Sequence, residues 1–459
     1  MPPRDTLPSV RNVSTTPVST TDRLTPSPVP VAALRYGVEP DGVPQTLPGF
    51  VISVAGCGAC AERYLAVRSM SRILIIGNHC EQLLNFRGDL IRHLQSRGHE
   101  VVAASPPGSA EVDRRFTSWG VRRVNLNIDR TGVSIAGDLR LLRALQQMLQ
   151  REKPDLVLAY TIKPVIYGAL AARWAGRPPM VAMITGLGLA FSAPTSWKEW
   201  LVRTFARALY RLAMPCVDVV IFQNPDDEAD FRTHGLIGAR HRVEHIDGSG
   251  INLQRFARAP LPAGPLRFVM ISRLLGDKGV REYIAAATQV RRRHREVECH
   301  LVGPFDPNPS GLTPDEIDAA VADGAIAYTG FTRDIRPHLA ACHVFVLPSY
   351  REGTPRSVLE ALAVGRPVIT TDAPGCRETV VDGQNGLLIQ PRDAQALADA
   401  MCRMIEGGSS SLARMAEASY RLAHDRFDVV RVNEKLAAIL EAARDRHETS
   451  PDSHRNIAP

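Results

Sequence analysis

The sequence predicts an α/β protein with two doubly wound parallel-sheet (Rossmann-like) domains that face a cleft, preceded by a disordered N-terminal leader. The chain has 459 residues, a length that favours two or three domains over one. Short apolar runs alternate with segments of helical periodicity, which is typical of parallel sheets covered by helices on both faces. The alternation stops at a Pro/Gly-rich stretch, Pro260 to Pro265, and then starts again.

Composition excludes several classes of protein. With 44% hydrophobic and 22% charged residues, the chain is neither disordered throughout, nor collagen-like, nor an integral membrane protein. The net charge of +7 favours anionic ligands or an anionic membrane surface, and it is too diffuse to indicate nucleic acid. Eight scattered cysteines favour a reducing cytoplasm over a disulfide framework. We therefore expect a cytoplasmic protein that can lie peripherally on the cytoplasmic membrane face.

Shifts in composition set the expected domain boundaries. Residues 1–69 are predicted to be a disordered leader, because the first 48 of them contain ten of the 34 prolines and eleven Ser or Thr. An N-terminal domain is expected over 70–258 and a C-terminal domain over 259–425. A C-terminal helix over 426–446 and a disordered tail over 447–459 complete the prediction.

Apolar runs mark the expected strands, and amphipathic segments at 134–150 and 196–213 mark two of the helices between them. The strands of the first domain are expected at 72–76, 100–104, 121–124, 155–160, 180–184, 217–222 and 242–246. Those of the second domain are expected at 266–272, 298–302, 325–329, 343–347, 366–370 and 386–389.

One expected helix, Trp197 to Leu212, has two unlike faces. An apolar arc consists of Trp197, Leu201, Phe205, Ala208, Leu209 and Leu212. Arg203, Arg207 and Arg211 form a cationic stripe that includes Trp200. In one interpretation the arc packs on the sheet and the arginines are solvated. In the other, the helix docks at a membrane interface with its arginines on anionic lipid.

The strongest polar motif is Arg351 to Glu360, which follows the expected strand 343–347 and opens a helix. Pro355 suits the start of that helix, where a missing N–H costs nothing. The backbone amides near Gly353 and Thr354 then face the cleft as a site for an anion.

Two carboxylates frame this motif. Glu352 lies on the loop and Glu360 lies inside the helix. Both are expected to face a polyhydroxylated ligand, because carboxylates accept hydrogen bonds from sugar hydroxyls. The alternative is that Glu352 only satisfies the helix dipole and Glu360 lies on the surface.

Two cations, Arg273 and Lys278, follow the first strand of the second domain at a strand-to-helix turn. Arg offers a bidentate fork to phosphate oxygens, and Lys offers a mobile point charge. The alternative is a solvated loop with ordinary charges.

Together these residues resemble the retaining glycosyltransferases of the GT-B fold, family 4. The resemblance rests on the E-x7-E pair Glu352/Glu360, the R-x4-K pair Arg273/Lys278 and the interdomain stretch Gly248 to Phe256. Two later runs, 371–380 and 382–386, also fit, and the resemblance extends over roughly 72–425.

The first domain narrows the resemblance to bacterial enzymes that extend polysaccharide or glycan precursors on polyprenyl diphosphate. Three segments carry it: Asn85-Phe86-Arg87-Gly88, Thr161-Ile162-Lys163-Pro164 and Thr185-Gly186-Leu187-Gly188. Each follows an expected strand, so all three are expected to line the acceptor half of the cleft. The candidate acceptor contacts are Asn85, Arg87, Lys163 and Gly186. Arg87 and Lys163 are the candidate anion contacts, with surface or capping charges as the alternative.

The resemblance implies transfer of a hexose or N-acetylhexosamine from a nucleotide sugar, a UDP-sugar, to a polyprenyl-diphosphate-linked or oligosaccharide acceptor, with retention. It implies that Glu352 holds the donor sugar, that Glu360 holds the ribose, and that Arg273 and Lys278 hold the diphosphate with the helix amides. Glu352, Arg273 and Lys278 are thus the candidate catalytic residues. No Asp-x-Asp motif stands in a suitable loop, so we expect no metal and no cofactor beyond the nucleotide sugar as co-substrate.

Two other functions are compatible with such a fold. A sugar-nucleotide 2-epimerase would release a free altered sugar nucleotide without an acceptor, and the combination of R-x4-K with E-x7-E argues against it. A non-catalytic sugar-nucleotide-binding module would scaffold an assembly complex. The intact motif residues argue against that alternative.

Overall fold

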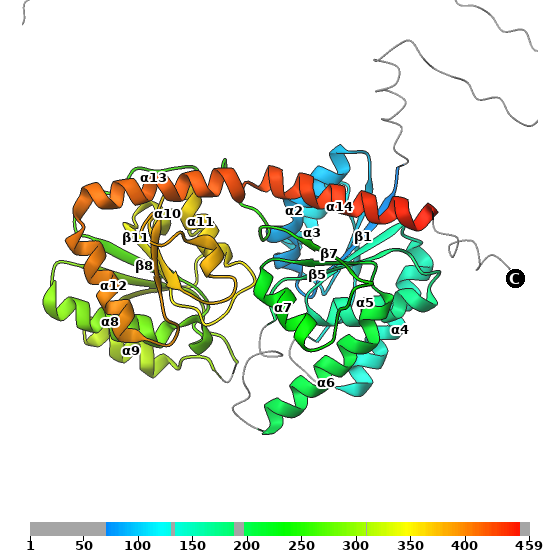
Figure 1. Cartoon of the computed structure of the whole chain (residues 1–459), viewed down its shortest axis with the longest axis horizontal. Helices are drawn as coiled ribbons and strands as arrows, with labels where there is room; N and C mark the ends of the chain where they lie inside the picture. Colours follow the sequence, from blue (N-terminus) through cyan, green and yellow to red (C-terminus); the bar gives the residue numbers. More distant parts are fainter. Residues whose placement is uncertain (1–69, 130–133, 188–196, 309, 450–459) are drawn as a thin grey trace, which may run out of the picture. The chain divides into compact units, whose positions relative to one another are not determined.

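The computed structural model describes residues 70–129, 134–187, 197–308 and 310–449. The predicted leader lies outside the described residues, as does most of the predicted tail. Within the described ranges the chain forms two α/β domains, each built on a parallel sheet (Figure 1). The predicted fold class is confirmed.

The first domain carries a seven-stranded parallel sheet. Its strands are β1 (Arg72–Ile76), β2 (Glu100–Ser105), β3 (Arg122–Asn125), β4 (Leu156–Tyr160), β5 (Met180–Ile184), β6 (Val219–Phe222) and β7 (Arg242–His245). They are ordered β3-β2-β1-β4-β5-β6-β7. Leu74 of β1 lies beside Val102 of β2 and Val157 of β4. Central strands such as β4 and β5 are apolar throughout because helices cover both faces of the sheet.

The helices of the first domain are α2 (Cys80–Ser96), α3 (Ala110–Ser118), α4 (Ile135–Glu152), α5 (Ile162–Trp174), α6 (Trp197–Ala213) and α7 (Pro225–Thr233). One core cluster joins α2 and α3 to the sheet, for example through Leu83 and Phe116. The other joins α4 and α5 to the opposite face, for example through Leu145 and Val165.

The second domain carries a six-stranded parallel sheet. Its strands are β8 (Arg267–Ile271), β9 (Glu298–Val302), β10 (Ala327–Gly330), β11 (Val344–Leu347), β12 (Val368–Thr371) and β13 (Gly386–Ile389). They are ordered β10-β9-β8-β11-β12-β13. Its helices are α8 (Val280–Arg293), α9 (Pro314–Ala322), α10 (Arg336–Ala340), α11 (Arg356–Val364), α12 (Ala394–Glu406) and α13 (Gly408–Arg426). The expected strands of both domains match the observed ones to within two residues at each end.

The last helix, α14 (Val429–Thr449), departs from the prediction of a helix over 426–446 and a disordered tail from 447. It begins three residues later than predicted, and residues 447–449 are helical. Its apolar side chains, including Leu436 and Leu440, join the core of the first domain. Figure 1 shows α13 over the second domain and α14 along the first. Helix α14 therefore packs on the first domain, although it follows the second domain in the sequence.

The two crossings between the domains are hydrogen-bonded to each other. The amide of Ile251 donates to the carbonyl of Phe427 at 2.7 Å, and the amide of Val429 donates to the carbonyl of Ile251 at 3.0 Å. Gly250 has φ +67°, and a Cβ there would lie 2.6 Å from Cα of Val429. Only glycine meets both conditions, because it lacks Cβ and tolerates positive φ.

Helix α6 leaves most of its apolar arc exposed, unlike in the first interpretation of its sequence. Trp197, Leu201, Phe205 and Leu212 of the apolar arc are exposed. Arg203 is buried and lies on the same side as Tyr210, which packs edge-on against Phe231 of α7 at 5.2 Å. The prediction that the arc packs on the sheet under solvated arginines is wrong. The amphipathic period was visible in the sequence, but the side that faces the core was set by tertiary packing.

Candidate active site

A cleft of ≈ 520 Å³ lies where the strand order of each sheet reverses. The reversal falls between β1 and β4 in the first sheet and between β8 and β11 in the second, and open α/β sheets bind ligands outside the carboxyl ends of such strands. The predicted site residues that line the cleft are Arg87, Arg273, Lys278, Glu352, Gly353, Thr354 and Glu360. The structure thus brings together every candidate donor contact and one candidate acceptor contact.

Lys278 and Glu352, both from the second domain, form an ion pair in this cleft. Nζ of Lys278 lies 2.6 Å from Oε1 of Glu352, and both side chains are mostly buried. From the sequence motifs, Lys278 was expected to bind phosphate and Glu352 was expected to bind sugar hydroxyls, with no contact between the two residues. In the structure the ammonium group also orients the carboxylate, because a charge-assisted hydrogen bond has a defined geometry.

Arg273 is held by a carboxylate that sequence reasoning missed. Its Nη1 lies 2.5 Å from Oδ2 of Asp306, which is 8% exposed. Asp306 follows β9, the neighbour of β8 in the sheet. An acid shortly after the adjacent strand was the only signal available in the sequence. Arg273 itself is half-exposed and faces the cleft.

Glu360 pairs with Arg356, one turn before it on α11, at 3.2 Å. Burial raises the pKa of Glu360, and the charge of Arg356 acts in the opposite direction. Arg356 also donates to the Ser249 hydroxyl at 2.9 Å and to the Gly250 carbonyl at 2.5 Å. It therefore links the second domain to the interdomain stretch. The i,i+4 spacing from Glu360 was the signal that could have found it.

The loop before α11 touches the first domain through glycine. A Cβ on Gly353 would lie 2.3 Å from the carbonyl oxygen of Thr185, and one on Gly186 would lie 3.0 Å from the amide nitrogen of Gly353. The side chain of Asn224 donates to the Gly353 carbonyl at 2.9 Å. Gly186, a candidate acceptor contact, thus abuts Gly353 and is not among the residues that line the cleft.

On the acceptor side the structure corrects two expectations. Asn85-Phe86-Arg87-Gly88 follows β1, as expected, and lies within α2, but not all of its residues reach the cleft. The helical turn directs Phe86 and Arg87 to the cleft and leaves Asn85 exposed and outside its lining. Of the third segment, Thr185 lines the cleft, and Gly188 lies outside the described residues.

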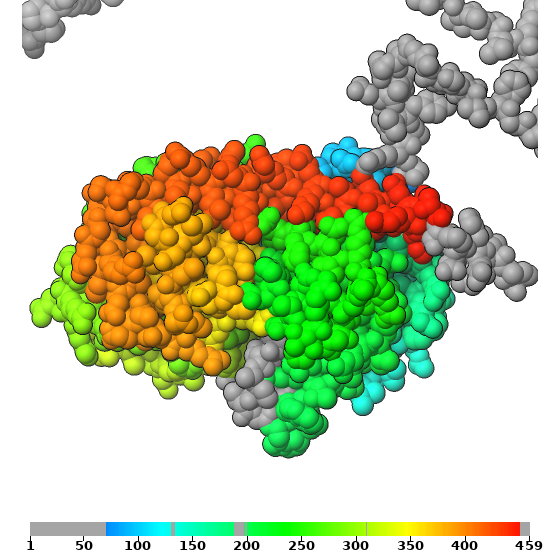
Figure 2. Space-filling model, viewed as in Figure 1, coloured from blue at the N-terminus to red at the C-terminus, as the bar shows by residue number. Residues whose placement is uncertain are grey.

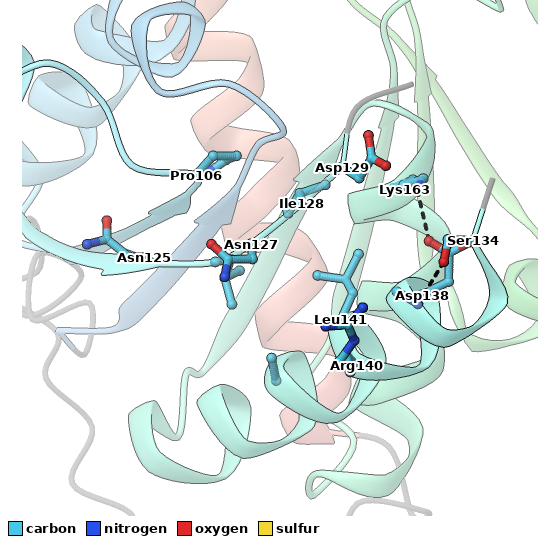
Figure 3. A pocket seen from close by; sticks show the side chains of 13 residues that line it. Pro106, Asn125, Asn127, Ile128, Asp129, Ser134, Asp138, Arg140, Leu141 and Lys163 are labelled. Carbon is cyan, nitrogen blue, oxygen red and sulfur yellow. Dashed lines mark hydrogen bonds and ion pairs between the residues drawn. The ribbon is translucent and has the colours of Figure 1, made fainter. Parts of the chain in front are cut away.

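The second corrected expectation is that Lys163 lines the cleft. It lies on α5 and pairs with Asp138 of α4 at 2.8 Å. Both line a separate hollow of ≈ 690 Å³ within the first domain (Figure 3), and Lys163 is not among the residues that line the cleft. Its charge is already matched by a neighbouring acid that the sequence places 25 residues away.

No group of three or more His, Cys, Asp or Glu side chains forms a candidate metal site within the described ranges. No helix in these ranges combines the length and the apolarity needed to cross a bilayer.

Comparison with known proteins agrees with this architecture. Residues 86–247 match the family described as a glycosyl transferase 4-like domain, and residues 265–407 match the family described as glycosyl transferases group 1. Two such domains around a cleft define a glycosyltransferase of the GT-B class. The chain belongs to family 4 of these enzymes.

Two curated relatives are similar over most of their length. One is the N,N'-diacetylbacillosaminyl-diphospho-undecaprenol alpha-1,3-N-acetylgalactosaminyltransferase of Campylobacter jejuni, 29% identical over 73% of this chain and 89% of the relative. The other is the UDP-Gal:alpha-D-GlcNAc-diphosphoundecaprenol alpha-1,3-galactosyltransferase of Escherichia coli, 26% identical over 60% and 72%.

Solved structures share the fold. HepE from Anabaena in complex with UDP aligns with a TM-score of 0.65 at 22% identity, covering 81% of this chain and all of that one. Sucrose-phosphate synthase from Thermosynechococcus elongatus aligns with a TM-score of 0.67 at 19% identity, covering 83% of this chain and all of that one.

Proposed function

We propose that this glycosyltransferase moves a hexose or N-acetylhexosamine from a UDP-sugar to a polyprenyl-diphosphate-linked glycan, with retention, in cell-surface polysaccharide or glycan biosynthesis. The observation that carries the proposal is the convergence of two cations and two carboxylates, Arg273, Lys278, Glu352 and Glu360, on one interdomain cleft. The names of the two curated relatives support a diphospho-undecaprenol acceptor, and the HepE complex supports a UDP donor.

In this proposal the donor lies on the second domain. Glu360 accepts hydrogen bonds from the ribose hydroxyls, and Glu352 accepts them from the sugar. Arg273 and Lys278 face the diphosphate. Each of the four side chains is fixed by a partner within 3.2 Å in the free protein. The site is therefore largely oriented before the donor arrives, which reduces the cost of ordering it.

Arg273 and Lys278 would supply the driving interaction. Breaking the bond to the anomeric carbon moves negative charge onto the leaving diphosphate, so fixed cations stabilise the transition state more than the ground state. These two side chains then take the part that a divalent ion has in other glycosyltransferases. We accordingly propose a metal-independent reaction, and activity is expected to persist in EDTA.

Attachment to a membrane surface on the cytoplasmic side is part of the proposal. The candidate contact is the exposed apolar arc of α6 together with the neighbouring Trp200, because Trp197 is 69% and Trp200 55% exposed. Tryptophan partitions to the headgroup region. Binding to phosphatidylglycerol-containing vesicles is expected to weaken in Trp200→Glu and to stay unchanged in Arg211→Gln. Equal binding of Trp200→Glu would show that α6 is not the contact.

One assay tests the function itself. The protein is incubated with radiolabelled UDP-sugars, with and without a bacterial membrane lipid extract. Transfer of label to lipid, with the donor anomeric configuration kept in the NMR spectrum of the product, supports the proposal. Conversion of the free sugar nucleotide without lipid would indicate an epimerase, and binding without turnover would indicate a non-catalytic module.

A further inference from the structure

Arg87 differs from the other cations that line the cleft. Arg273, Lys278 and Arg356 each pair with a carboxylate, whereas the described residues contain no carboxylate paired with Arg87. Its only hydrogen bond runs from Nη2 to Sδ of Met183 at 2.8 Å, and its Nε has no partner among the described residues. The side chain is 3% exposed. A buried cation without a counterion destabilises the folded protein unless a bound anion pairs with it.

Within the described part of the chain, no negative charge compensates Arg87. Its guanidinium lies 5.3 Å from the ring centre of Tyr160 at the end of β4, a contact that supplies only a weak attraction. Burial lowers the pKa of Arg87 to about 10, and the positive charge of Arg356 on the opposite wall acts in the same direction. Arg87 is therefore still a cation at neutral pH, next to a second cation.

Two hydroxyls beside Arg87 also lack partners. The hydroxyl groups of Tyr160 and Thr161 are buried and have no hydrogen-bond partner among the described residues, and both residues line the same cleft. Thr161 has φ +69°, an outlying value for a β-branched residue. Backbone strain of this kind persists where the surrounding structure imposes it, and it concentrates at ligand sites. Three side chains of the first domain that line this cleft thus carry polar groups without a partner among the described residues.

We propose that Arg87, with the hydroxyls of Tyr160 and Thr161, forms a second anion site, which binds the diphosphate of a prenyl-diphosphate acceptor. This site is distinct from the donor cations Arg273 and Lys278, because it belongs to the first domain and they belong to the second. A guanidinium and two hydroxyls match the many acceptor oxygens of a diphosphate. The identity of the acceptor rests on the proposed function, whereas the need for an anion rests on Arg87 itself.

Binding of farnesyl diphosphate, a short soluble prenyl diphosphate, tests this site in the full chain. Saturating UDP occupies the donor site, and isothermal titration then measures farnesyl diphosphate. We expect the wild type to bind it with UDP present, and Arg87→Met to lower that affinity about tenfold or more while UDP affinity stays unchanged. Arg92→Met is the matched control, because Arg92 lies exposed on the same helix. Inorganic pyrophosphate in a parallel titration separates recognition of the diphosphate from recognition of the prenyl chain.

Thermal unfolding without ligand separates a ligand contact from a structural role. A buried arginine without a counterion is replaced favourably by an apolar side chain of similar length, so Arg87→Met is expected to raise the Tm of the free protein. A structural arginine would lower it. Arg87→Lys and Tyr160→Phe, which change the site less, are expected to bind farnesyl diphosphate with intermediate affinity.

Three results would overturn the proposal: unchanged affinity of Arg87→Met for farnesyl diphosphate, a lowered Tm of that variant, or competition between UDP and farnesyl diphosphate in the wild type. The last result would mean a single anion site. A wild type that binds farnesyl diphosphate through Arg87 but does not bind UDP would contradict the proposed donor and leave this site supported.

Discussion

Nη2 of Arg351 lies 2.5 Å from Oδ1 of Asp227, whose side chain is fully buried in the first turn of α7. The same nitrogen lies 2.6 Å from Oδ2 of Asp230. Arg351 directly precedes Glu352, so this contact ties the loop that carries the candidate sugar-binding carboxylate to the other domain. A second arginine, Arg377, reaches Asp226 of the same helix at 2.8 Å.

Loss of the Arg351 side chain is expected to destabilise the protein. Arg351→Met leaves Asp227 buried without its cation, and breaking a buried pair from one side costs about 3 kcal/mol. Urea denaturation measures the decrease in the free energy of unfolding. Arg333→Met is the matched control, because Arg333 makes an exposed contact with Glu111 across the same two domains at 3.6 Å. Exposed pairs contribute about 1 kcal/mol or less, so equal losses in the two variants would contradict this interpretation.

Glu352→Gln is expected to lower kcat by about two orders of magnitude with little change in Tm. The amide keeps the size of the side chain but loses the charge that Lys278 orients and that the sugar hydroxyls require. Steady-state kinetics and thermal unfolding check the two parts. Glu406→Gln, a change to an exposed carboxylate on α12, is the control. A Glu352→Gln enzyme with wild-type turnover would remove Glu352 from the site.

Arg273→Ala and Lys278→Ala are each expected to lower kcat about 10²–10³-fold, well beyond any rise in donor KM. The double variant should lose less than the product of the two, because both cations act on one diphosphate. Arg273→Lys should recover part of the loss, since an ammonium group lacks the bidentate fork. Kinetics at low and high ionic strength check this. A KM effect that salt screens, with kcat unchanged, would mean that the two charges only attract the donor.

The pH profile should respond to Arg356. Burial raises the pKa of Glu360, while the positive charges that face it, Arg356 and then Arg255, act to lower it. Arg356→Gln removes the nearer charge, so the pKa rises further and Glu360 becomes protonated at higher pH. A protonated carboxyl accepts fewer hydrogen bonds from ribose. The acid limb of kcat/KM for the donor is therefore expected to move to higher pH.

The control for that profile is Arg414→Gln, which removes an exposed charge from α13. An acid limb that stays in place in Arg356→Gln, or that moves equally in Arg414→Gln, would show that Glu360 does not govern donor binding.

The sequence by itself determined the strands, the two-domain order and the position of the donor motifs. Strands buried on both faces must be apolar along their whole length, so β1 and β5 were visible as short runs. Motifs that directly follow such strands reach the cleft because parallel strands end at one edge of the sheet. Arg273 and Glu352 could be placed for that reason.

Tertiary structure decided which charges meet and which faces turn inward. The partners Lys278 and Glu352 lie 74 residues apart in the sequence. Arg273 and Asp306, which also pair, follow two adjacent strands, β8 and β9. Likewise, Lys163 pairs with Asp138 and does not line the cleft, and the sequence alone could not show this pairing. Periodicity showed that α6 has two faces, but only the packing of Tyr210 on Phe231 fixed which face is buried. Local patterns record the shape of each element, whereas pairing and burial depend on contacts between segments that are distant in the chain.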